Sequence, residues 1–426
     1  MASDFLHFDI LSVRKRAYRG RCFAEPTHSS RNCVPEKHNP EVKTMSTTLH
    51  PHALLHADEK VPEAQDFMPL LGTDHVEFYV GNAKQAAHFY RTAFGMSLVA
   101  YSGPETGQHD RASYVVQQGK VRFVLTTALR ASHAIAAQTQ RHGDGVHAIA
   151  LLVNDARQAW AAATERGAVC AQEPTTLRDE QGEVTLASIQ AYGDTVHTFV
   201  ERRGYRGVFL PGYRAIAQDT IARPVGLLHI DHMVGNVGWH QMDEWVAFYE
   251  RVMGFRLYQH FDDNDISTEY SALMSKVMAN GNGYVKFPIN EPAEGRRKSQ
   301  VEEFLDFYDG PGVQHIALAT HDILHTVSSL QRQGVEFLRV PHSYYTELEQ
   351  RIGHIDEPIR DLEELGILVD RDDEGYMLQI FTRPVEDRPT LFFEIIQRKG
   401  SRSFGKGNFR ALFEAIEREQ QARGNL

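Results

Sequence analysis

The sequence predicts an α+β fold of tandem βαβββ modules, which form two open barrels of curved, antiparallel-rich sheet with helices on the outside. One pattern occurs at residues 72–99 and again at 229–258, and a second occurs at 143–169 and again at 310–337. Short runs rich in β-branched and aromatic residues separate the helical stretches. Because internal repetition indicates one structural unit used several times, we interpret the chain as units A, B, A′ and B′.

Units A and A′ each begin with a strand that contains Asp-His and continue with an amphipathic helix. Gly95 and Gly254 mark the predicted ends of these helices. Units B and B′ begin with a glycine turn, followed by an apolar strand, a helix that starts at an Asp and a glycine stop. Antiparallel strands and hairpins are predicted between the helices, for example at residues 112–129, 283–289 and 375–384. Residues 206–226 carry two prolines and no clear period, so we predict a linker between the halves.

Length and repetition together predict three segments: a flexible N-terminal extension at 1–65, an N-terminal structural domain at 66–215 and a C-terminal catalytic domain at 216–426. The extension has a small basic cluster without periodicity, which favours a disordered tail. A targeting peptide is the alternative, although an apolar h-region is missing. Met45 is a second candidate start of the chain.

Composition excludes several classes of protein. The net charge of −11 disfavours a nucleic-acid partner, which requires a basic surface. No run of 18 apolar residues occurs, so no membrane span is predicted. Three cysteines without a CxxC pair indicate a reducing, cytoplasmic setting. With 22 histidines, a metal site would use imidazole and carboxylate rather than thiolate.

Three residues in the second half form a candidate metal site. His232 lies in the first strand of unit A′, His315 in the first strand of B′, and Glu394 in the last strand of B′. Each histidine alone is more typical of a hydrogen-bonded core residue. A lone carboxylate in an apolar strand, however, is costly to bury without a cation or a proton partner. Two imidazoles and one carboxylate form the facial triad that leaves coordination positions open on Fe(II), so we predict one Fe(II) per chain.

The repeat provides an internal comparison for this site. His75 matches His232, Ala148 matches His315, and we align Glu201 with Glu394. The first half is therefore expected to keep two of three ligands and to be structural. His147 is offset by one residue and is expected to point to the other face of its strand.

Several blocks of the second half are similar to those of the 4-hydroxyphenylpyruvate dioxygenases, a family of the vicinal-oxygen-chelate (glyoxalase-like) superfamily. These blocks are DHMVGNV (231–237), FPINEP (287–292), RRKSQVEEFL (296–305), GVQHIALAT (312–320), GILVDRDDEGYMLQIFTRPVEDRPTLFFEIIQR (366–398) and FGKGNF (404–409). The likeness covers roughly residues 65–420 and is denser in the second half.

The resemblance implies an Fe(II)-dependent dioxygenase that acts on a small aromatic 2-oxo acid and O₂. In tyrosine and phenylalanine catabolism, this family converts 4-hydroxyphenylpyruvate and O₂ to homogentisate and CO₂. A cytoplasmic homodimer or homotetramer is also implied, with neither a nucleic-acid nor a membrane partner.

The resemblance further implies a pocket beside the metal. Gln300 and Gln379 are expected to be catalytic, and the full substrate-binding set is Ser271, Asn290, Gln300, Gln314, Gln379, Phe381, Phe392, Asn408, Phe409 and Leu412. Gln379 and Phe381 lie two residues apart, so both are expected to face the cavity beside Phe392. Phe381 and Phe392 are expected to hold an aromatic ring between them by stacking. Gln314 alternates with His315 and would face away by simple parity.

A C-terminal helix follows the FGKGN block. Phe409, Leu412, Phe413 and Ile416 form one apolar face, and Asn408 is a predicted N-cap. This pattern is typical of a helix packed on the barrel. The resemblance implies that the same helix closes the mouth of the pocket, with Asn408, Phe409 and Leu412 turned inward.

Three alternatives remain open. A hydroxymandelate synthase would use the same substrate and iron but oxidise the benzylic carbon; the bulk of Phe381 counts against it. An extradiol-type dioxygenase shares the fold and the ligand set. A metal-free binding module of the same fold would not require the two histidines and the glutamate.

Overall fold

The computed structural model describes residues 66–261 and 272–425. The predictions for residues 1–65, including the candidate start at Met45, and for Ser271 lie outside the described residues. Among the residues described, no helix is both long and apolar enough to cross a membrane.

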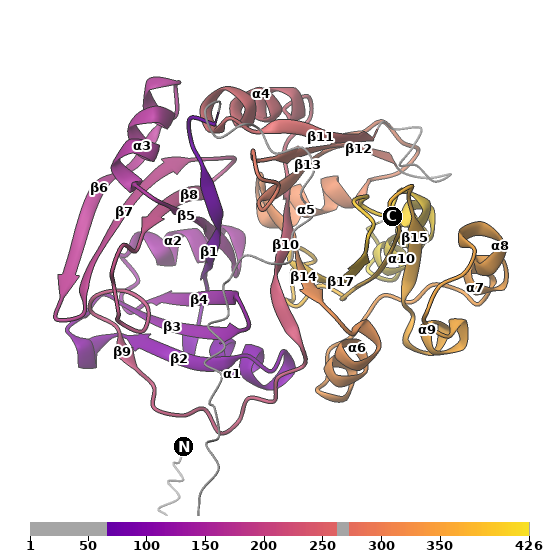
Figure 1. Ribbon diagram of the computed structural model, residues 1–426, viewed down its shortest axis with the longest axis horizontal. Helices are drawn as coiled ribbons and strands as arrows, with labels where there is room; N and C mark the ends of the chain where they lie inside the picture. Colours follow the sequence, from indigo (N-terminus) through magenta and orange to yellow (C-terminus); the bar gives the residue numbers. More distant parts are fainter. Residues whose placement is uncertain (1–65, 262–271, 426) are drawn as a thin grey trace, which may run out of the picture. The chain divides into compact units, whose positions relative to one another are not determined.

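The first half forms one sheet of nine described strands in the order β6-β7-β8-β5-β1-β4-β3-β2-β9 (Figure 1). Its elements in chain order are β1 (Leu70–Tyr79), α1 (Ala83–Ala93), β2 (Ser97–Ser102), η2 (Pro104–Thr106), β3 (Arg111–Gln118), β4 (Val121–Ala128), α2 (Ala134–His142), β5 (Gly145–Val153), α3 (Ala156–Glu165), β6 (Cys170–Asp179), β7 (Gly182–Gln190), β8 (Val196–Glu201) and β9 (Arg214–Ala215).

The second half forms a sheet of eight described strands in the order β11-β12-β13-β10-β14-β17-β16-β15. Its elements are β10 (Leu227–Asn236), α4 (Met242–Met253), β11 (Arg256–Phe261), β12 (Ala272–Ala279), β13 (Lys286–Ala293), α5 (Gln300–Tyr308), β14 (Gly312–Thr320), α6 (Ile323–Arg332), α7 (Ser343–Thr346), α8 (Leu348–Ile352), α9 (Ile359–Leu365), β15 (Leu368–Arg371), β16 (Tyr376–Phe381), β17 (Phe392–Lys399), η3 (Lys406–Asn408) and α10 (Phe409–Ala422).

The predicted tandem βαβββ architecture is confirmed. Each unit runs strand, helix and three strands, and its first and last strands pair in parallel, as β1 does with β4 and β14 with β17. The remaining strand pairs are antiparallel, for example β10 with β14. Unit B′ also contains the short helices α7, α8 and α9 between α6 and β15, which the repeat did not predict. The predicted domain boundary after residue 215 falls between β9 and β10.

Helix ends follow the capping residues in the sequence. Asp155 accepts a hydrogen bond from the Gln158 backbone N at 2.9 Å, and Asp322 accepts one from the His325 backbone N at 2.9 Å. These carboxylates satisfy amide groups that the first helical turn leaves unpaired. Gly254 ends α4 in the left-handed region, at φ 68°, where glycine carries no Cβ penalty.

The segment at 206–226 does more than link the halves. Its short strand β9 pairs with β2, and the side chains of Phe209 and Leu210 are buried in a cluster with Val124 and Val200. Apolar side chains of this segment therefore pack inside the first barrel.

One apolar core connects the two sheets. Phe393 of β17 lies against Tyr90, Phe94 and Phe123 of the first half, with ring centroids 5.9, 4.9 and 5.8 Å apart. All four side chains are at most 5% exposed. Such contacts stabilise the pairing of the halves by burying aromatic surface.

Candidate metal centre

Three neighbouring strands of the second sheet carry the predicted ligands. Ala317 of β14 is the register partner of both His232 on β10 and Glu394 on β17. His315 precedes Ala317 by two residues on β14 and therefore shares its face. The methyl group of Ala317 leaves space between the flanking side chains. One ligand atom from each of His232, His315 and Glu394 lies within 4.8 Å of the others.

His232 and Glu394 are buried, His315 is half-buried, and the three groups face one another. Glu394 Oε2 lies 3.1 Å from His232 Nε2 and 3.6 Å from His315 Nε2. Burial alone would raise the pKa of Glu394, but the charge and hydrogen bonding of the two histidines lower it below its usual range. Burial opposes the charged form of His232, yet Glu394 and Asp231 raise its pKa above the ordinary value.

The donor set fits a divalent cation. His232 Nδ1 lies 2.8 Å from Asp231 Oδ1, and His315 Nδ1 lies 3.0 Å from Gln314 Oε1. A proton on each Nδ1 leaves both Nε2 lone pairs directed at a carboxylate. Among the described residues, Glu394 Oε1 is buried without a hydrogen-bond partner. Three electron-pair donors therefore face one another, and a cation between them would balance the arrangement. Two imidazoles with one carboxylate form a ligand set that suits Fe(II).

A cavity of about 80 Å³ opens beside these groups. Its lining residues are His232, Val234, Phe261, Leu273, Ser275, Val277, Pro288, Asn290, Gln300, Gln314, His315, Phe381, Phe392, Glu394, Phe404, Phe409, Leu412 and Phe413. Most of these side chains are apolar, with polar groups gathered at a few points. Such a lining is typical of a small-molecule site that fixes orientation with a few hydrogen bonds.

Most predicted pocket residues lie in this cavity. The structure brings together Asn290, Gln300, Gln314, Phe381, Phe392, Phe409 and Leu412 with the three candidate ligands. Ser299 caps α5 by accepting from the Glu302 backbone N at 3.2 Å, which fixes the first turn that carries Gln300.

Asn408 does not line the cavity, although it was predicted to turn inward. Its side chain is fully buried, and its Oδ1 accepts a hydrogen bond from the Tyr344 hydroxyl at 2.6 Å. At the start of α10, which lies within the described residues, the Asn408 side chain does not form the predicted N-cap hydrogen bond. The partner lies 64 residues away in the sequence, so local spacing gave no indication of it.

Gln379 is likewise absent from the cavity lining. It pairs with Ile396, whereas Phe381 pairs with Glu394, so Gln379 lies two residues further along the strand from the candidate metal centre. Its side chain is 1% exposed and lies against Gly405, where an added Cβ would be 2.4 Å from Nε2. Gln379 therefore lies outside the lining of this cavity, and its catalytic role stays a prediction.

Gln314 lines the cavity, contrary to simple alternation. The register of β14 against β10 shifts here, because Val234 pairs with His315 while Gly235 pairs with Val313. Gln314 is the extra residue of this β-bulge, and a bulge redirects side chains away from strict alternation. The first half has the same shift, with His147 as the extra residue between Val146 and Ala148.

The alignment of Glu201 with Glu394 is wrong. Thr198 pairs with Ala150 in the first sheet, as Glu394 pairs with Ala317 in the second. Thr198 is therefore the counterpart of Glu394. The first half keeps one of the three candidate ligands rather than two.

Glu201 has a different counterpart, Gln397. Glu201 Oε2 accepts from the backbone N of Ala156 at 3.2 Å, and Gln397 Oε1 accepts from that of Ile323 at 2.9 Å. Both side chains satisfy an amide at the start of a helix. Matching by residue type alone missed this shared role.

The two phenyl rings are not parallel plates. Phe381 and Phe392 lie 6.2 Å apart at an interplanar angle of 71°, while Phe392 stacks on the His315 imidazole at 4.8 Å and 20°. The stacking partner of Phe392 is thus the candidate ligand, and an aromatic guest would meet one phenyl face and one edge.

Phe404 and Ser275 are among the cavity residues that the sequence analysis did not predict. Phe404 places its ring 4.9 Å from the His232 imidazole at 67°. It lies in the quoted FGKGNF block, but its position relative to the metal depends on a loop. Ser275 shares a strand face with Leu273 and Val277, and this alternation could have indicated it.

Comparisons with known proteins agree with this geometry. The Glyoxalase/Bleomycin resistance protein/Dioxygenase superfamily matches residues 72–192 and 229–380. A 4-hydroxyphenylpyruvate dioxygenase from Yarrowia lipolytica is 50% identical, covering 83% of this chain and 93% of its own length. One from Dictyostelium discoideum is 49% identical over 83% of this chain and 100% of its own length.

Among solved structures, a mutant of 4-hydroxymandelate synthase from Streptomyces coelicolor superposes with a TM-score of 0.75 at 34% identity, covering 83% of this chain and all of that chain. The identity to the dioxygenases is thus higher than the identity to the synthase. The tandem fold, the clustered histidines and glutamate, and these likenesses together show that the chain belongs to the 4-hydroxyphenylpyruvate dioxygenase family.

Proposed function

We propose that this chain is an Fe(II)-dependent dioxygenase that converts 4-hydroxyphenylpyruvate and O₂ to homogentisate and CO₂. The observation that carries the proposal is the meeting of His232, His315 and Glu394 at the wall of a mostly apolar cavity. The 44–50% identity to relatives named as this dioxygenase supports the choice of substrate.

His232, His315 and Glu394 would hold one Fe(II) per chain. When bound, Fe(II) supplies the redox chemistry with O₂ that couples decarboxylation of the 2-oxo acid to hydroxylation of the ring. The rest of the site positions the substrate. Asn290 and Gln300 offer amide groups to its polar ends, while the surrounding apolar side chains exclude water. Phe381 limits where the aromatic ring lies.

The test is direct. Purified protein is incubated with Fe(II), O₂ and 4-hydroxyphenylpyruvate, and the product is identified by mass spectrometry and NMR. Homogentisate with stoichiometric CO₂ is expected. Hydroxymandelate as the main product, or no product despite bound iron, would contradict the proposal.

A hydroxymandelate synthase is the second candidate, because the solved synthase shares the fold over its whole length. The same assay separates the two. A homodimer or homotetramer and a cytoplasmic location remain proposals from the family; light scattering of the purified protein tests the first, and fractionation of the source cells the second.

A further inference from the structure

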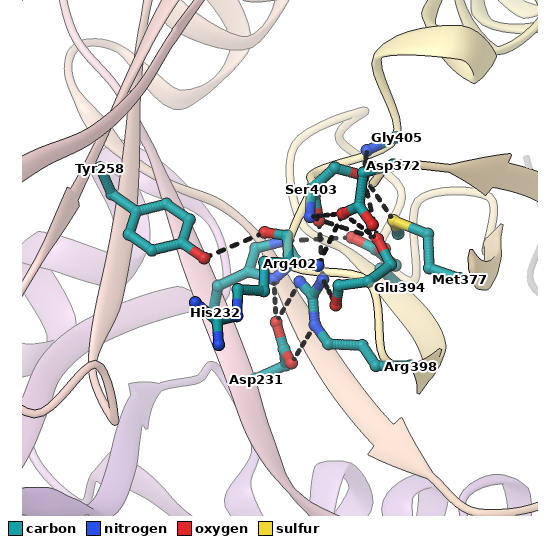
Figure 2. A network of polar contacts seen from close by, with 11 residues as sticks. Asp231, His232, Tyr258, Asp372, Met377, Glu394, Arg398, Arg402, Ser403 and Gly405 are labelled. Atoms are coloured by element: carbon teal, nitrogen blue, oxygen red, sulfur yellow. Dashed lines mark hydrogen bonds and ion pairs between the residues drawn. The ribbon is translucent and has the colours of Figure 1, made fainter. Parts of the chain in front are cut away.

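A half-buried arginine, Arg398, is linked to the candidate ligand His232 through Asp231 (Figure 2). Arg398 donates from Nε to Asp231 Oδ2 at 2.8 Å and from Nη2 to Oδ1 at 2.9 Å. Asp231 Oδ1 in turn lies 2.8 Å from His232 Nδ1. The Asp231 and His232 side chains are only 6% and 4% exposed. A bidentate arginine fixes a carboxylate in both position and orientation.

The same arginine holds the loop that covers the imidazole. Arg398 Nη1 donates to the carbonyl oxygens of Ser401 at 3.3 Å and Ser403 at 2.6 Å. Asp372 fixes this loop from the other side, because it accepts from the backbone N of Arg402 at 2.7 Å and of Ser403 at 2.8 Å, as Figure 2 shows.

The loop leads directly to Phe404, whose ring meets His232 edge to face at 4.9 Å. The Arg398 guanidinium lies 5.4 Å from the centroid of the same ring. Arg398, Asp231, His232 and Phe404 therefore form one contact set, which we term the imidazole clamp. Asp231 and Phe404 contact the His232 ring, and Arg398 holds both of them in place.

The first half contains the same clamp. Arg202 binds both oxygens of Asp74 at 2.6 and 2.8 Å, and Asp74 Oδ1 lies 2.6 Å from His75 Nδ1. The His75 and Phe209 rings lie 5.0 Å apart at 79°, and Arg202 lies 5.1 Å from the Phe209 centroid. Two copies of one clamp thus exist, but only the second has a histidine and a glutamate opposite it.

We propose that Asp231 is a positioning residue for the metal centre. It keeps the proton of His232 on Nδ1, and Arg398 keeps the carboxylate in place, so that Nε2 presents its lone pair toward Glu394 and His315. An acceptor of this kind on a ligating imidazole raises metal affinity. The inference rests on the proposed metal site.

The duplicate clamp makes a purely structural role the competing explanation, and it also provides the control. Asp231→Asn and Asp74→Asn each replace a carboxylate that binds one bidentate arginine and one histidine, although Asp74 Oδ1 also lies 3.7 Å from Arg122 Nη1. A structural role predicts equal effects of the two substitutions on every property. A positioning role predicts that both lower stability, whereas only Asp231→Asn weakens metal binding.

The experiment titrates the full chain with Co(II) under anaerobic conditions and records the visible d–d spectrum, alongside thermal melting of each metal-free variant. Asp231→Asn is expected to raise the Kd for Co(II) about 10–100-fold and to alter the spectrum. Asp74→Asn should match the wild type in both. Equal Co(II) affinity and identical spectra for the two variants would overturn the inference.

A second pair protects the test against misfolding. If Asp231→Asn does not fold, Arg398→Lys and Arg202→Lys keep the charge but lose the bidentate geometry, and the same asymmetry in Co(II) affinity is expected. Equal affinity in this pair would likewise overturn the inference. His315→Ala distinguishes failure of the proposed metal site from failure of the positioning role of Asp231. If this variant binds Co(II) as tightly as the wild type, the proposed metal site itself is contradicted.

Discussion

His315 illustrates how much a single residue can do at this site. Its Nδ1 lies beside Gln314 Oε1, its Nε2 faces Glu394, and its ring stacks on Phe392 at 4.8 Å. One side chain therefore belongs to the metal centre, to the β-bulge and to the aromatic wall. A change at this position is expected to affect chemistry more than folding, because the strand β14 retains its backbone pairing.

His315→Ala is expected to abolish iron retention and turnover, since two ligands remain where three are needed. Iron per chain is measured after gel filtration, and the fold is checked by circular dichroism. The matched control is His75→Ala, which removes the first-half counterpart of His232. Turnover that survives in His315→Ala would contradict the assignment of this ligand.

Phe381→Val tests how the ring is positioned. Phe381 lies 5.9 Å from the His315 ring and lines the cavity, so a smaller side chain lets the substrate ring shift relative to the metal. We expect part of the product to become hydroxymandelate, measured by liquid chromatography with mass detection. Ile380→Val, on the opposite strand face and 1% exposed, is the control. An unchanged product ratio would rule out this role for Phe381.

At the scale of elements, the β-bulge in β14 recurs in β5, at Gln314 and His147. A bulge adds one residue to one strand, so the face of every side chain beyond it changes relative to a regular ladder. The repeat predicted both strands and located the ligands. It could not predict the bulge, because hydrophobic alternation in GVQHIAL and GVHAIAL does not show which residue is unpaired.

Ala148→His tests the independence of the two sheets. The substitution places an imidazole at the first-half counterpart of His315, but Thr198 there provides no carboxylate. We therefore expect one iron per chain and unchanged turnover, measured by metal analysis and steady-state assay. A fall in turnover would mean that the first half contributes to the active site.

Across the whole molecule, the sequence located the strands and helices of the repeated units, but not α7, α8 and α9, because the repeated elements show short-range periodicity. It also indicated His232, His315 and Glu394, because their residue types are those of metal ligands. Contacts between segments far apart in the sequence could not be predicted in this way. The partner of Asn408 is Tyr344, and the arginine that holds Asp231 comes from a strand 167 residues later. Likewise, the register of β8 against β5, rather than residue type, decides that Thr198 replaces Glu394.

His197 connects the halves and makes stability depend on pH. Its Nε2 lies 2.8 Å from the Tyr249 hydroxyl, and its ring stacks on Phe287 at 5.3 Å. Burial lowers the pKa of His197 to about 4. Below pH 6.5, His197 binds a proton in the unfolded chain but stays neutral in the folded chain. The free energy of unfolding therefore falls as pH decreases toward 4.

The free energy of unfolding is measured by chemical denaturation at pH 7 and pH 5 for the wild type and His197→Gln. The wild type should lose about 2 kcal/mol more than the variant between these values, since each pKa unit corresponds to about 1.4 kcal/mol. His88→Gln alters an exposed histidine and serves as the control. Equal losses in all three proteins would contradict the role of His197.

The duplicated clamp has a consequence for protein engineering. Only positions 148 and 198 separate the first barrel from a complete set of two imidazoles and one carboxylate, while Asp74 and Arg202 already orient His75. What stands in the way is bulk, because Phe209 and Leu210 occupy the interior. Emptying that space and replacing Ala148 by His and Thr198 by Glu would give the first barrel the same three donor groups as the candidate metal centre, so that one site could be redesigned without loss of the other.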